Sequence, residues 1–524
     1  MIKSGSLRDQ ELEHYLSISP QFQLGELPTE QPHPETRDLS RLAQEDLGEA
    51  LRVLKSVDQS ALEVLLRNPE RLEFLTAKIR NVLQAGNRVY LCGCGATGRL
   101  SIALETIWRE QWAGTANEDQ VRSFMAGGDL ALIKSIENFE DVPAFAERQL
   151  VGSGFRNGDL LIGCSEGGET PFVIAAVEKA LEISRRKPFF LYCNPDSILC
   201  RVAERSARVI RNPSIHTLSL ETGPMAISGS TRMQATTVLM AAVGFSLLGY
   251  NESFEEIRNR IERLVQSWHE MDTGFLAPFV RVEANCYEAG EYVLYETDEN
   301  FGISILTDTT ERAPTFSLLP FENRNENSKL SWCYLYFPHA RNSEKAWTLL
   351  LRRKPRTLEW EEIDGIASWE RLMGFDFSSG LLEHRKKLSD GRRHHLFRIH
   401  RIEEGIRLEL DDLRHDLVTE GLDRLSEHLL LKLVLNTHST LIMGRMGRYE
   451  GNVMTWVRPS NYKLIDRTIR YVDMFLKREG IKRTYEEIAA LCFEMMDGLE
   501  EDQPLVLRVV EKILGRAPGY DSRV

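Results

Sequence analysis

The residues Arg88-Val-Tyr-Leu-Cys-Gly-Cys-Gly-Ala-Thr-Gly-Arg99 are the clearest indication of the fold class, because a short apolar run leads straight into a glycine-rich turn. Residues 88–92 are typical of a strand, residues 93–98 of a tight turn, and residues 99–112 of a helix. Glycines let backbone N–H groups approach an anion, and the following helix offers its positive end. The sequence therefore predicts either a phosphate-binding loop, with the Thr97 hydroxyl as a further donor, or a plain turn in which Thr97 caps the helix.

The same strand–turn–helix order continues along the first half of the chain. Further strands are predicted at residues 121–125, 159–164, 188–193 and 207–210, with helices at residues 131–151 and after residue 171. Strands that alternate with helices at this spacing predict a parallel sheet with helices on both faces. Ligands of such sheets bind beyond the carboxyl ends of the strands, which is where the predicted turns lie.

A second and weaker copy of this pattern follows. Strand patterns occupy residues 292–295, 330–337, 394–399 and 405–410, and a long helix predicted at residues 425–446 mirrors one at residues 232–248. A chain of 524 residues is too long for one ordinary core. We therefore expect an α/β protein with two flavodoxin-like, three-layer αβα domains, N-terminal helices and a C-terminal helical cap. The predicted divisions are residues 1–55 (N-terminal extended and helical segment), 56–265 (first α/β domain), 266–460 (second, degenerate α/β domain) and 461–524 (helical cap or lid).

Composition narrows the possible partners. The formal net charge is -13, which disfavours nucleic acid, because affinity for a phosphate backbone depends on many Lys and Arg side chains. No apolar run is long enough to suggest a membrane span or a signal peptide, so a cytoplasmic location is expected. The eight cysteines form no CxxC pair. Cys92 and Cys94 share a predicted strand face, but no matching Cys or His pair follows, so we expect no metal and no cofactor.

A dinucleotide-binding fingerprint is the obvious alternative for a GxGxxG turn. That fingerprint expects an acidic residue about 20 positions later, at the end of the next strand, where it holds a ribose. Here the next strand ends in Ala126-Gly-Gly128, and the first acidic residue is Asp129. The sequence therefore favours a single anion in a local pocket over a dinucleotide.

Two more turns of the same chemistry support an anion site. Ser165-Glu-Gly167-Gly follows a predicted strand and opens a helix. Ser228-Gly-Ser230-Thr231-Arg232 is a run of hydroxyls at a helix start, and its arginine is able to grip a phosphate or an acidic neighbour. Each turn alone is explained by helix capping. Three of them at strand ends or helix starts of one sheet predict convergence on one anion.

Two pairs of acidic residues are candidates for contacts with a sugar. Glu137 and Glu140 are three positions apart, which puts them on one face if the segment is helical. Asp308 and Glu311 have the same spacing in the second half. Each pair is interpreted either as a solvated helix face or as hydroxyl recognition and general-base chemistry. The spacing does not decide between these two interpretations.

These motifs resemble the SIS (sugar isomerase) family, most closely its N-acetylmuramic acid 6-phosphate etherases and its glucokinase regulatory proteins, which carry two SIS domains and a helical lid. The resemblance covers about residues 27–250 and 428–468. Its motifs are Gly93-Cys-Gly-Ala-Thr-Gly-Arg-Leu100, Gly223-Pro-Met-Ala-Ile-Ser-Gly-Ser-Thr-Arg-Met233, Leu435-Asn-Thr-His-Ser-Thr440, Asn461-Tyr-Lys-Leu-Ile-Asp466 and, for the regulators, residues 27–38.

The resemblance implies two SIS domains and a set of site residues. The positions where the family cradles phosphate are Thr97, Ser165, Gly167, Ser230, Thr231 and Arg232, and we add Gly95 of the first turn. Arg448 stands where a regulator lysine reaches the phosphate, and Glu137 and Glu140 match the pair near the sugar.

One departure from the etherases bears on catalysis. Etherases need a second glutamate in an Asp-x-x-Glu-x-x-Pro pattern, and the first half of this chain has Ile107 at that position. The second half keeps the pattern as Asp308, Glu311 and Pro314. Because two etherase subunits face each other, the resemblance implies that the second domain stands in for a second subunit and brings Glu311 toward the first domain's site.

Three functions remain open from the sequence. The leading hypothesis is a sugar-phosphate-binding regulator of carbohydrate or amino-sugar metabolism, with a sugar kinase as a possible partner. The alternative is an etherase-type lyase that releases lactate from N-acetylmuramic acid 6-phosphate with Glu140 and Glu311. An aldose–ketose isomerase is the third, with His216 as its nearest candidate histidine. Fructose phosphates and N-acetylmuramic acid 6-phosphate are the expected classes of ligand.

Overall fold

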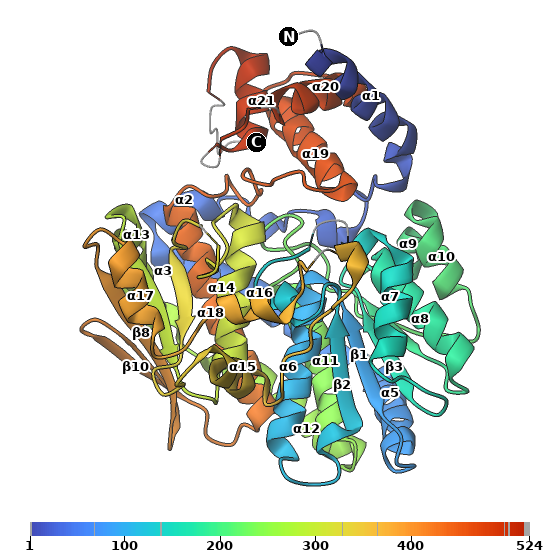
Figure 1. The fold of residues 1–524 in the computed structure, drawn as a ribbon. Coiled ribbons are helices and arrows are strands. Elements are labelled where there is room, and N and C mark those ends of the chain that lie inside the picture. Colours follow the sequence, from blue (N-terminus) through green and yellow to red (C-terminus); the bar gives the residue numbers. More distant parts are fainter. Residues whose placement is uncertain are drawn as a thin grey trace.

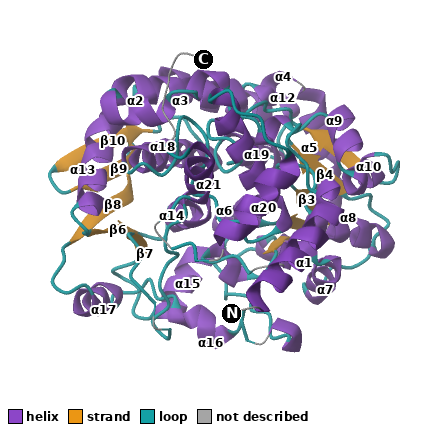
Figure 2. Cartoon of the chain, turned by 90° about the horizontal axis from the view of Figure 1, so that it is seen from above, coloured by secondary structure: helices purple, strands orange, loops and turns teal. Residues whose placement is uncertain are grey.

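Two five-stranded sheets lie on opposite sides of the molecule in the computed structural model, with helices between and around them (Figures 1 and 2). The structure describes residues 3–67, 69–136, 139–326, 328–363, 365–496, 498–500 and 503–517. The expected α/β class with two sheets is confirmed. Within the described ranges, none of the helices combines the length and apolar composition that a membrane crossing requires.

The first sheet is wholly parallel, with the strand order β2-β1-β3-β4-β5. Its strands are β1 (Val89–Gly93), β2 (Val121–Met125), β3 (Leu160–Cys164), β4 (Phe189–Tyr192) and β5 (His216–Ser219). Every residue of β1, β3 and β4 is buried, as expected when helices cover both faces of a parallel sheet. The helices of this first lobe are α5 (Pro69–Leu83), α6 (Gly95–Gln111), α7 (Pro143–Gly152), α8 (Pro171–Ile183), α9 (Asp196–Val202), α10 (Glu204–Ile210) and α11 (Gln234–Leu248).

Two predictions in the first lobe were wrong. Residues 207–210 belong to α10, and the fifth strand is β5. The helix predicted over residues 131–151 forms only from Pro143, after a 3₁₀ turn at Asp129–Leu132 and a second at Phe139–Asp141. Pro143 explains the late start, because proline disfavours the helical conformation of the residue before it, and Val142 is extended.

The second sheet has the order β10-β9-β8-β6-β7 and is mixed. Its strands are β6 (Tyr292–Thr297), β7 (Cys333–Tyr336), β8 (His394–Ile402), β9 (Gly405–Leu410) and β10 (Leu413–Val418). β6 pairs in parallel with β7 and β8, whereas β8, β9 and β10 form an antiparallel meander. The sheet was expected to be parallel, and the difference arises because tight turns join β8, β9 and β10.

Helices of the second lobe surround this sheet and meet the first lobe. They are α13 (Leu276–Glu288), α14 (Gly302–Phe316), α15 (Ser343–Leu351), α16 (Trp369–Gly374), α17 (Leu381–Leu388) and α18 (Arg424–Arg445). α18 packs on α11, and α14 packs on α6, so the two lobes share one apolar centre. Helices α2 (Leu39–Glu45), α3 (Leu47–Leu62), α4 (Val64–Arg67) and α12 (Phe254–Glu270) complete the packing around this centre.

A helical cap stands over both lobes (Figure 1). It consists of α19 (Tyr462–Arg478), α20 (Tyr485–Met496) and α21 (Leu505–Leu514), and α1 (Lys3–Ile18) from the other end of the chain packs on α20. The hydroxyls of Tyr15 and Tyr485 are 2.6 Å apart and join these two helices. The division of the chain at residues 55, 265 and 460 stays a prediction.

Candidate functional site

Of the three glycines in the turn after β1, Gly95 faces open space, whereas Gly93 and Gly98 are closely packed. A Cβ on Gly93 would lie 2.3 Å from the Thr97 carbonyl, and one on Gly98 would lie 2.5 Å from Met125 Cβ. Gly95 has φ +54, and no heavy atom lies within 4 Å of the place where its Cβ would be. The Cys94 N–H donates to Thr97 Oγ1 at 3.0 Å, so Thr97 holds the turn. The turn therefore presents Gly95, at the amino end of α6, to open space.

The turn after β3 is shaped by its own serine. Ser165 Oγ accepts a hydrogen bond from the Gly168 N–H at 3.1 Å and lies 2.9 Å from Thr170 Oγ1. Gly168 has φ +78, so a glycine is needed at this position. Gly167 accepts a hydrogen bond at its carbonyl oxygen from Asn194 Nδ2 at 3.0 Å. These contacts fix a second glycine turn at the carboxyl edge of the same sheet, where it opens α8.

The third turn, residues 228–232, contacts both the cap and the second lobe. Tyr471 of the cap donates its hydroxyl to the Ser228 carbonyl at 2.6 Å. Ser230 is buried, and Thr231 is half-buried beside it. Arg232 is only 3% exposed. Its guanidinium donates to Asp308 Oδ1 at 3.1 Å in the second lobe, so this arginine grips an acidic neighbour.

Glu140 lies against the first glycine turn. The Cys94 thiol donates to Glu140 Oε2 at 3.0 Å, and Asn461 Nδ2 donates to Glu140 Oε1 at 3.1 Å. Residues 139–141 form a 3₁₀ turn, so Glu140 does not stand on an α-helix as its spacing suggested. Its predicted companion, Glu137, lies outside the described residues. Glu140 thus connects a turn of the first sheet with the cap.

The second lobe holds the Glu140 segment in place. Its loop before α16 crosses onto the first lobe, where the Trp360 ring stacks on Phe139 with centroids 5.9 Å apart. In the same loop, the Arg353 guanidinium donates to both carboxylate oxygens of Asp129, at 2.6 and 2.9 Å. Asp129 and Phe139 flank the stretch that leads to Glu140. The position of Glu140 therefore depends on side chains of both lobes.

Glu311 of α14 is a buried carboxyl group at the interface between the lobes. It is 2% exposed, and neither carboxylate oxygen has a hydrogen-bond partner among the described residues. Burial raises its pKa above the ordinary value, although the positive charges of Lys432 and Arg99 oppose the shift. Arg99 extends from α6 of the first lobe and donates to Thr310 Oγ1 at 3.2 Å. The helix that follows the first glycine turn thus reaches the helix that carries Glu311.

Charged residues near this site were missed by the sequence analysis. Lys463 of the cap forms an ion pair with Glu169 in the turn after β3, and Arg205 pairs with the same carboxylate at 2.8 Å. Glu166 in that turn accepts from Thr236 Oγ1 at 2.9 Å, and burial raises its pKa to about 7. Lys463 lies within the motif Asn461–Asp466. Its ion pair with Glu169 joins residues far apart in the sequence, so the motif alone did not predict it.

Arg448 packs in the second lobe. Its guanidinium lies 5.0 Å from the ring centroid of Trp332 and 4.0 Å from that of Trp456. Trp332 lines a small cavity with Thr309 and Arg312 of the second lobe. Among the predicted residues, Gly95, Thr97, Ser165, Gly167 and Glu140 belong to turns at the carboxyl edge of the first sheet, whereas Arg232 and Glu311 form the boundary with the second lobe.

The chain is similar to several known proteins. Residues 73–181 match the glucokinase regulatory protein N-terminal SIS domain, which confirms the resemblance to the SIS family. N-acetylmuramic acid 6-phosphate etherase of Vibrio campbellii is 28% identical over 293 residues, which are 55% of this chain and 88% of the relative. The etherase of Klebsiella aerogenes is 30% identical over 214 residues, or 41% of this chain and 66% of the relative. The solved tagatose-6-phosphate ketose/aldose isomerase of Escherichia coli aligns over 78% of this chain and 95% of its own, at 11% identity and a TM-score of 0.41.

Proposed function

We propose that this chain binds a phosphorylated sugar at the carboxyl edge of the first sheet, under the cap. The observation that carries the proposal is the position of Glu140, which is bonded at once to Cys94 of the glycine turn and to Asn461 of the cap. A carboxylate in that position suits a sugar hydroxyl, while the adjacent turn offers N–H groups to an anion. The etherase relatives support the same class of ligand.

The phosphate is proposed to lie against the two glycine turns. The N–H groups at Gly95 and the start of α6 would donate to it, and Ser165 and Ser230 would supply hydroxyl donors. Thr97 would act mainly by holding the first turn in shape, since its hydroxyl is already bonded to Cys94. Lys463 would add positive charge from the cap, exchanging its present partner Glu169 for the ligand. Arg232 would act indirectly, by fixing the third turn to the second lobe.

The proposed role is that of a ligand-sensing regulator. Ligand contacts made by both the first lobe and the cap would favour one arrangement of the cap, and a partner such as a sugar kinase would recognise that arrangement. Two features support a regulator over an enzyme. Ile107 occupies the position of the glutamate that etherases need in this lobe, and Glu140 is bonded to the cap.

Calorimetry tests the binding proposal. Fructose 6-phosphate, fructose 1-phosphate and N-acetylmuramic acid 6-phosphate would each be titrated into the full chain, and at least one is expected to bind. Glu140→Gln should weaken that binding by about tenfold, because one hydrogen bond to a charged group contributes about 1.5 kcal/mol or more. Glu182→Gln, an exposed change in the same lobe, is the matched control. Equal affinities of wild type and Glu140→Gln, or no binding of any phosphorylated sugar, would contradict the proposal.

A lyase that releases lactate is the second candidate. The observation that favours it is Glu311, a buried carboxyl group with a raised pKa at the boundary of the two lobes. Elimination needs one group to take a proton from carbon and another to give a proton to the ether oxygen, and two carboxyl groups suit those roles. Glu140 would be the second group. The coverage of the Vibrio campbellii etherase, 88% of its length, supports the same candidate.

A lactate-release assay separates the two candidates. Incubation with N-acetylmuramic acid 6-phosphate should yield no lactate above background if the chain is a regulator. Turnover that disappears in both Glu140→Gln and Glu311→Gln would establish the lyase and reject the regulator. Turnover that persists in both variants would point to a contaminating enzyme, and the regulator would stand.

A further inference from the structure

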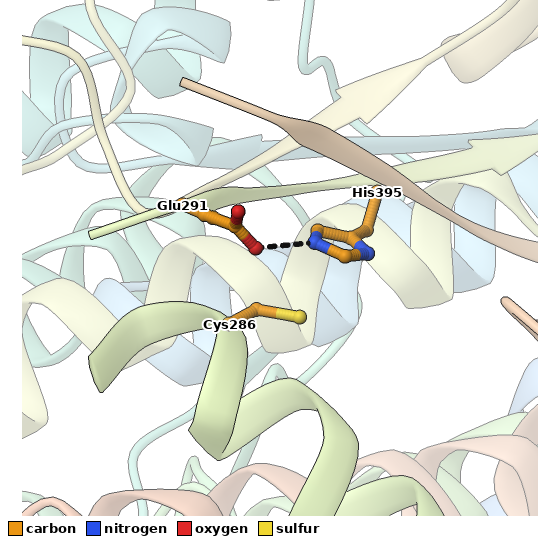
Figure 3. A group of neighbouring side chains, drawn as sticks. All are labelled: Cys286, Glu291 and His395. Carbon is orange, nitrogen blue, oxygen red and sulfur yellow. Dashed lines mark hydrogen bonds and ion pairs between the residues drawn. The ribbon is translucent and has the colours of Figure 1, made fainter. Parts of the chain in front are cut away.

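A cysteine, a glutamate and a histidine face one another at the amino ends of β6 and β8 in the second sheet. The ligand atoms of Cys286, Glu291 and His395 all lie within 4.8 Å of one another (Figure 3). Cys286 is 5% exposed, and the side chains of His395 and Glu291 are 5% and 31% exposed. The group is therefore buried on the protein side and open to solvent at the glutamate.

The backbone preorganises two of the three side chains. Helix α13 ends at Glu288, and Gly290 follows with φ +72, the left-handed conformation that commonly ends a helix. The Glu291 N–H then donates back to the Cys286 carbonyl at 2.8 Å. This reversal brings Glu291 beside Cys286 although five positions separate them in the sequence.

The third side chain comes from the sheet. His395 is the second residue of β8 and pairs with Val293 of β6. Along β8, His395, Phe397 and Ile399 are buried, whereas the residues between them are more exposed. Side chains of a strand alternate between faces, so His395 stands on the buried face. Figure 3 shows its ring directed toward Glu291, above the thiol of Cys286.

A second carboxylate fixes the histidine ring from its other side. His395 Nδ1 lies 2.8 Å from Asp411 Oδ2, and Nε2 lies 2.7 Å from Glu291 Oε2. A neutral imidazole has only one N–H donor, and both carboxylates are acceptors. One of the two contacts therefore requires either a further proton, on the ring or on a carboxyl group, or a cation bound between the ring and Glu291.

We propose that Cys286, Glu291 and His395 bind a zinc-class divalent cation, with Asp411 as the carboxylate that orients the histidine. Sulfur, imidazole and carboxylate are the ligand types that Zn²⁺ takes, and three protein ligands leave a fourth position for water. Bond lengths of about 2.0–2.3 Å separate tetrahedral ligands by about 3.5 Å, so small side-chain movements close the site. Asp411 on the second ring nitrogen matches the carboxylate–histidine–metal arrangement.

The cation would bind as the Cys286 thiol loses its proton to solvent, forming a metal–thiolate bond. Because the bound form is the thiolate, metal binding is expected to release a proton and to weaken as the pH falls. The site lies at the amino ends of β6 and β8, away from the carboxyl edge of the first sheet, so it is independent of the proposed sugar site.

Cobalt titration of the full chain tests the proposal. After chelator treatment, one equivalent of Co²⁺ should bind and give a thiolate-to-cobalt charge-transfer band. The band should vanish in Cys286→Ser and persist in Cys200→Ser, which changes a half-buried cysteine of the first lobe. Asp411→Asn should keep the band but lower the affinity by about 10- to 100-fold.

Two results would overturn the metal site. One is the absence of a stoichiometric band in the wild type. The other is a band of equal strength in Cys286→Ser. Should that variant fail to fold, X-ray absorption of the zinc-loaded wild type decides the matter: one sulfur in the zinc shell supports the proposal, and none contradicts it.

Discussion

Glu166, in the turn after β3, is a buried carboxyl group whose proton binding depends on folding. Its carboxyl group accepts one hydrogen bond from Thr236, and burial raises its pKa to about 7 from an ordinary value of 4.5. Between these two values the unfolded chain has lost the proton while the folded chain still holds it. The folded state therefore binds more protons in this window, and stability falls as the pH rises through it.

Glu166→Gln should remove this dependence. Glutamine keeps an oxygen for Thr236 but does not ionise, so the variant should gain stability over the wild type as the pH rises from about 4.5 to 8. The gain is expected to reach about 1–3 kcal/mol at pH 8. Denaturant unfolding at both pH values measures it, with Glu182→Gln as a surface control. A difference that does not change with pH would contradict the raised pKa.

Helix α19 is the element that links the cap to the proposed site. Asn461 caps it by accepting from the Leu464 N–H at 2.9 Å, and the same side chain donates to Glu140. Six residues further along the chain, Arg467 forms an ion pair with Glu30 at 2.6 Å. The start of α19 is thus fixed over the two glycine turns, and its first charged side chain, Lys463, faces Glu169.

Lys463→Gln should weaken binding of a phosphorylated sugar. A hydrogen bond to a charged phosphate contributes about 1.5–3 kcal/mol, so a loss of about 10- to 100-fold in affinity is expected. Lys477→Gln is the matched control, because Lys477 lies on the same helix and pairs with Asp473 at the surface. Calorimetry compares the two variants. Equal losses in both would remove Lys463 from the site.

Sequence patterns predicted most of the strands. They failed in segments where polar residues or a proline, rather than apolar spacing, determine the local structure. β1 to β4 and β6 to β9 correspond to apolar runs that were predicted. β5, with the sequence His-Thr-Leu-Ser, is short and half polar, and the apolar run of α10 was taken for a strand in its place. β10 has three consecutive polar residues in Leu-Arg-His-Asp-Leu-Val and lies at a sheet edge, so it shows no apolar pattern typical of a strand.

The site was predictable at its turns and not across the fold. Spacing within one motif indicated the glycine turns, because local backbone geometry depends on neighbouring residues. The contacts of Glu140 with Asn461 and of Arg232 with Asp308 join residues far apart in the sequence. Such pairs form when the two lobes and the cap pack together. The spacing of residues along the sequence does not predict how these parts pack.

At the scale of the whole molecule, buried charges join the two lobes. Asp308 accepts from Arg232 of the first lobe at 3.1 Å and from Arg312 of its own helix at 2.9 Å. Although burial opposes the shift, Arg312 and Arg232 hold the pKa of Asp308 below its ordinary value. Arg312 also pairs with the fully buried Glu283 at 2.8 Å. This network fixes one lobe against the other.

Arg232→Ala should destabilise the protein strongly. Removing one partner of a buried pair leaves the remaining charge poorly compensated, at a cost of about 3–5 kcal/mol. Arg258→Ala removes an exposed arginine that pairs with Glu262 and should cost about 1 kcal/mol or less. Thermal and denaturant unfolding compare the two. Similar losses in both variants would show that the buried network does not join the lobes.

The proposed site places one phosphorylated sugar where the first sheet, the second lobe and the cap meet. A crystal structure of the full chain with the sugar phosphate that binds most tightly is the decisive test. We expect a phosphate within hydrogen-bonding distance of the Gly95 N–H and the Ser165 hydroxyl, with a sugar hydroxyl on Glu140. A phosphate bound elsewhere, with Gly95, Ser165 and Glu140 free of contact to the ligand, would contradict it.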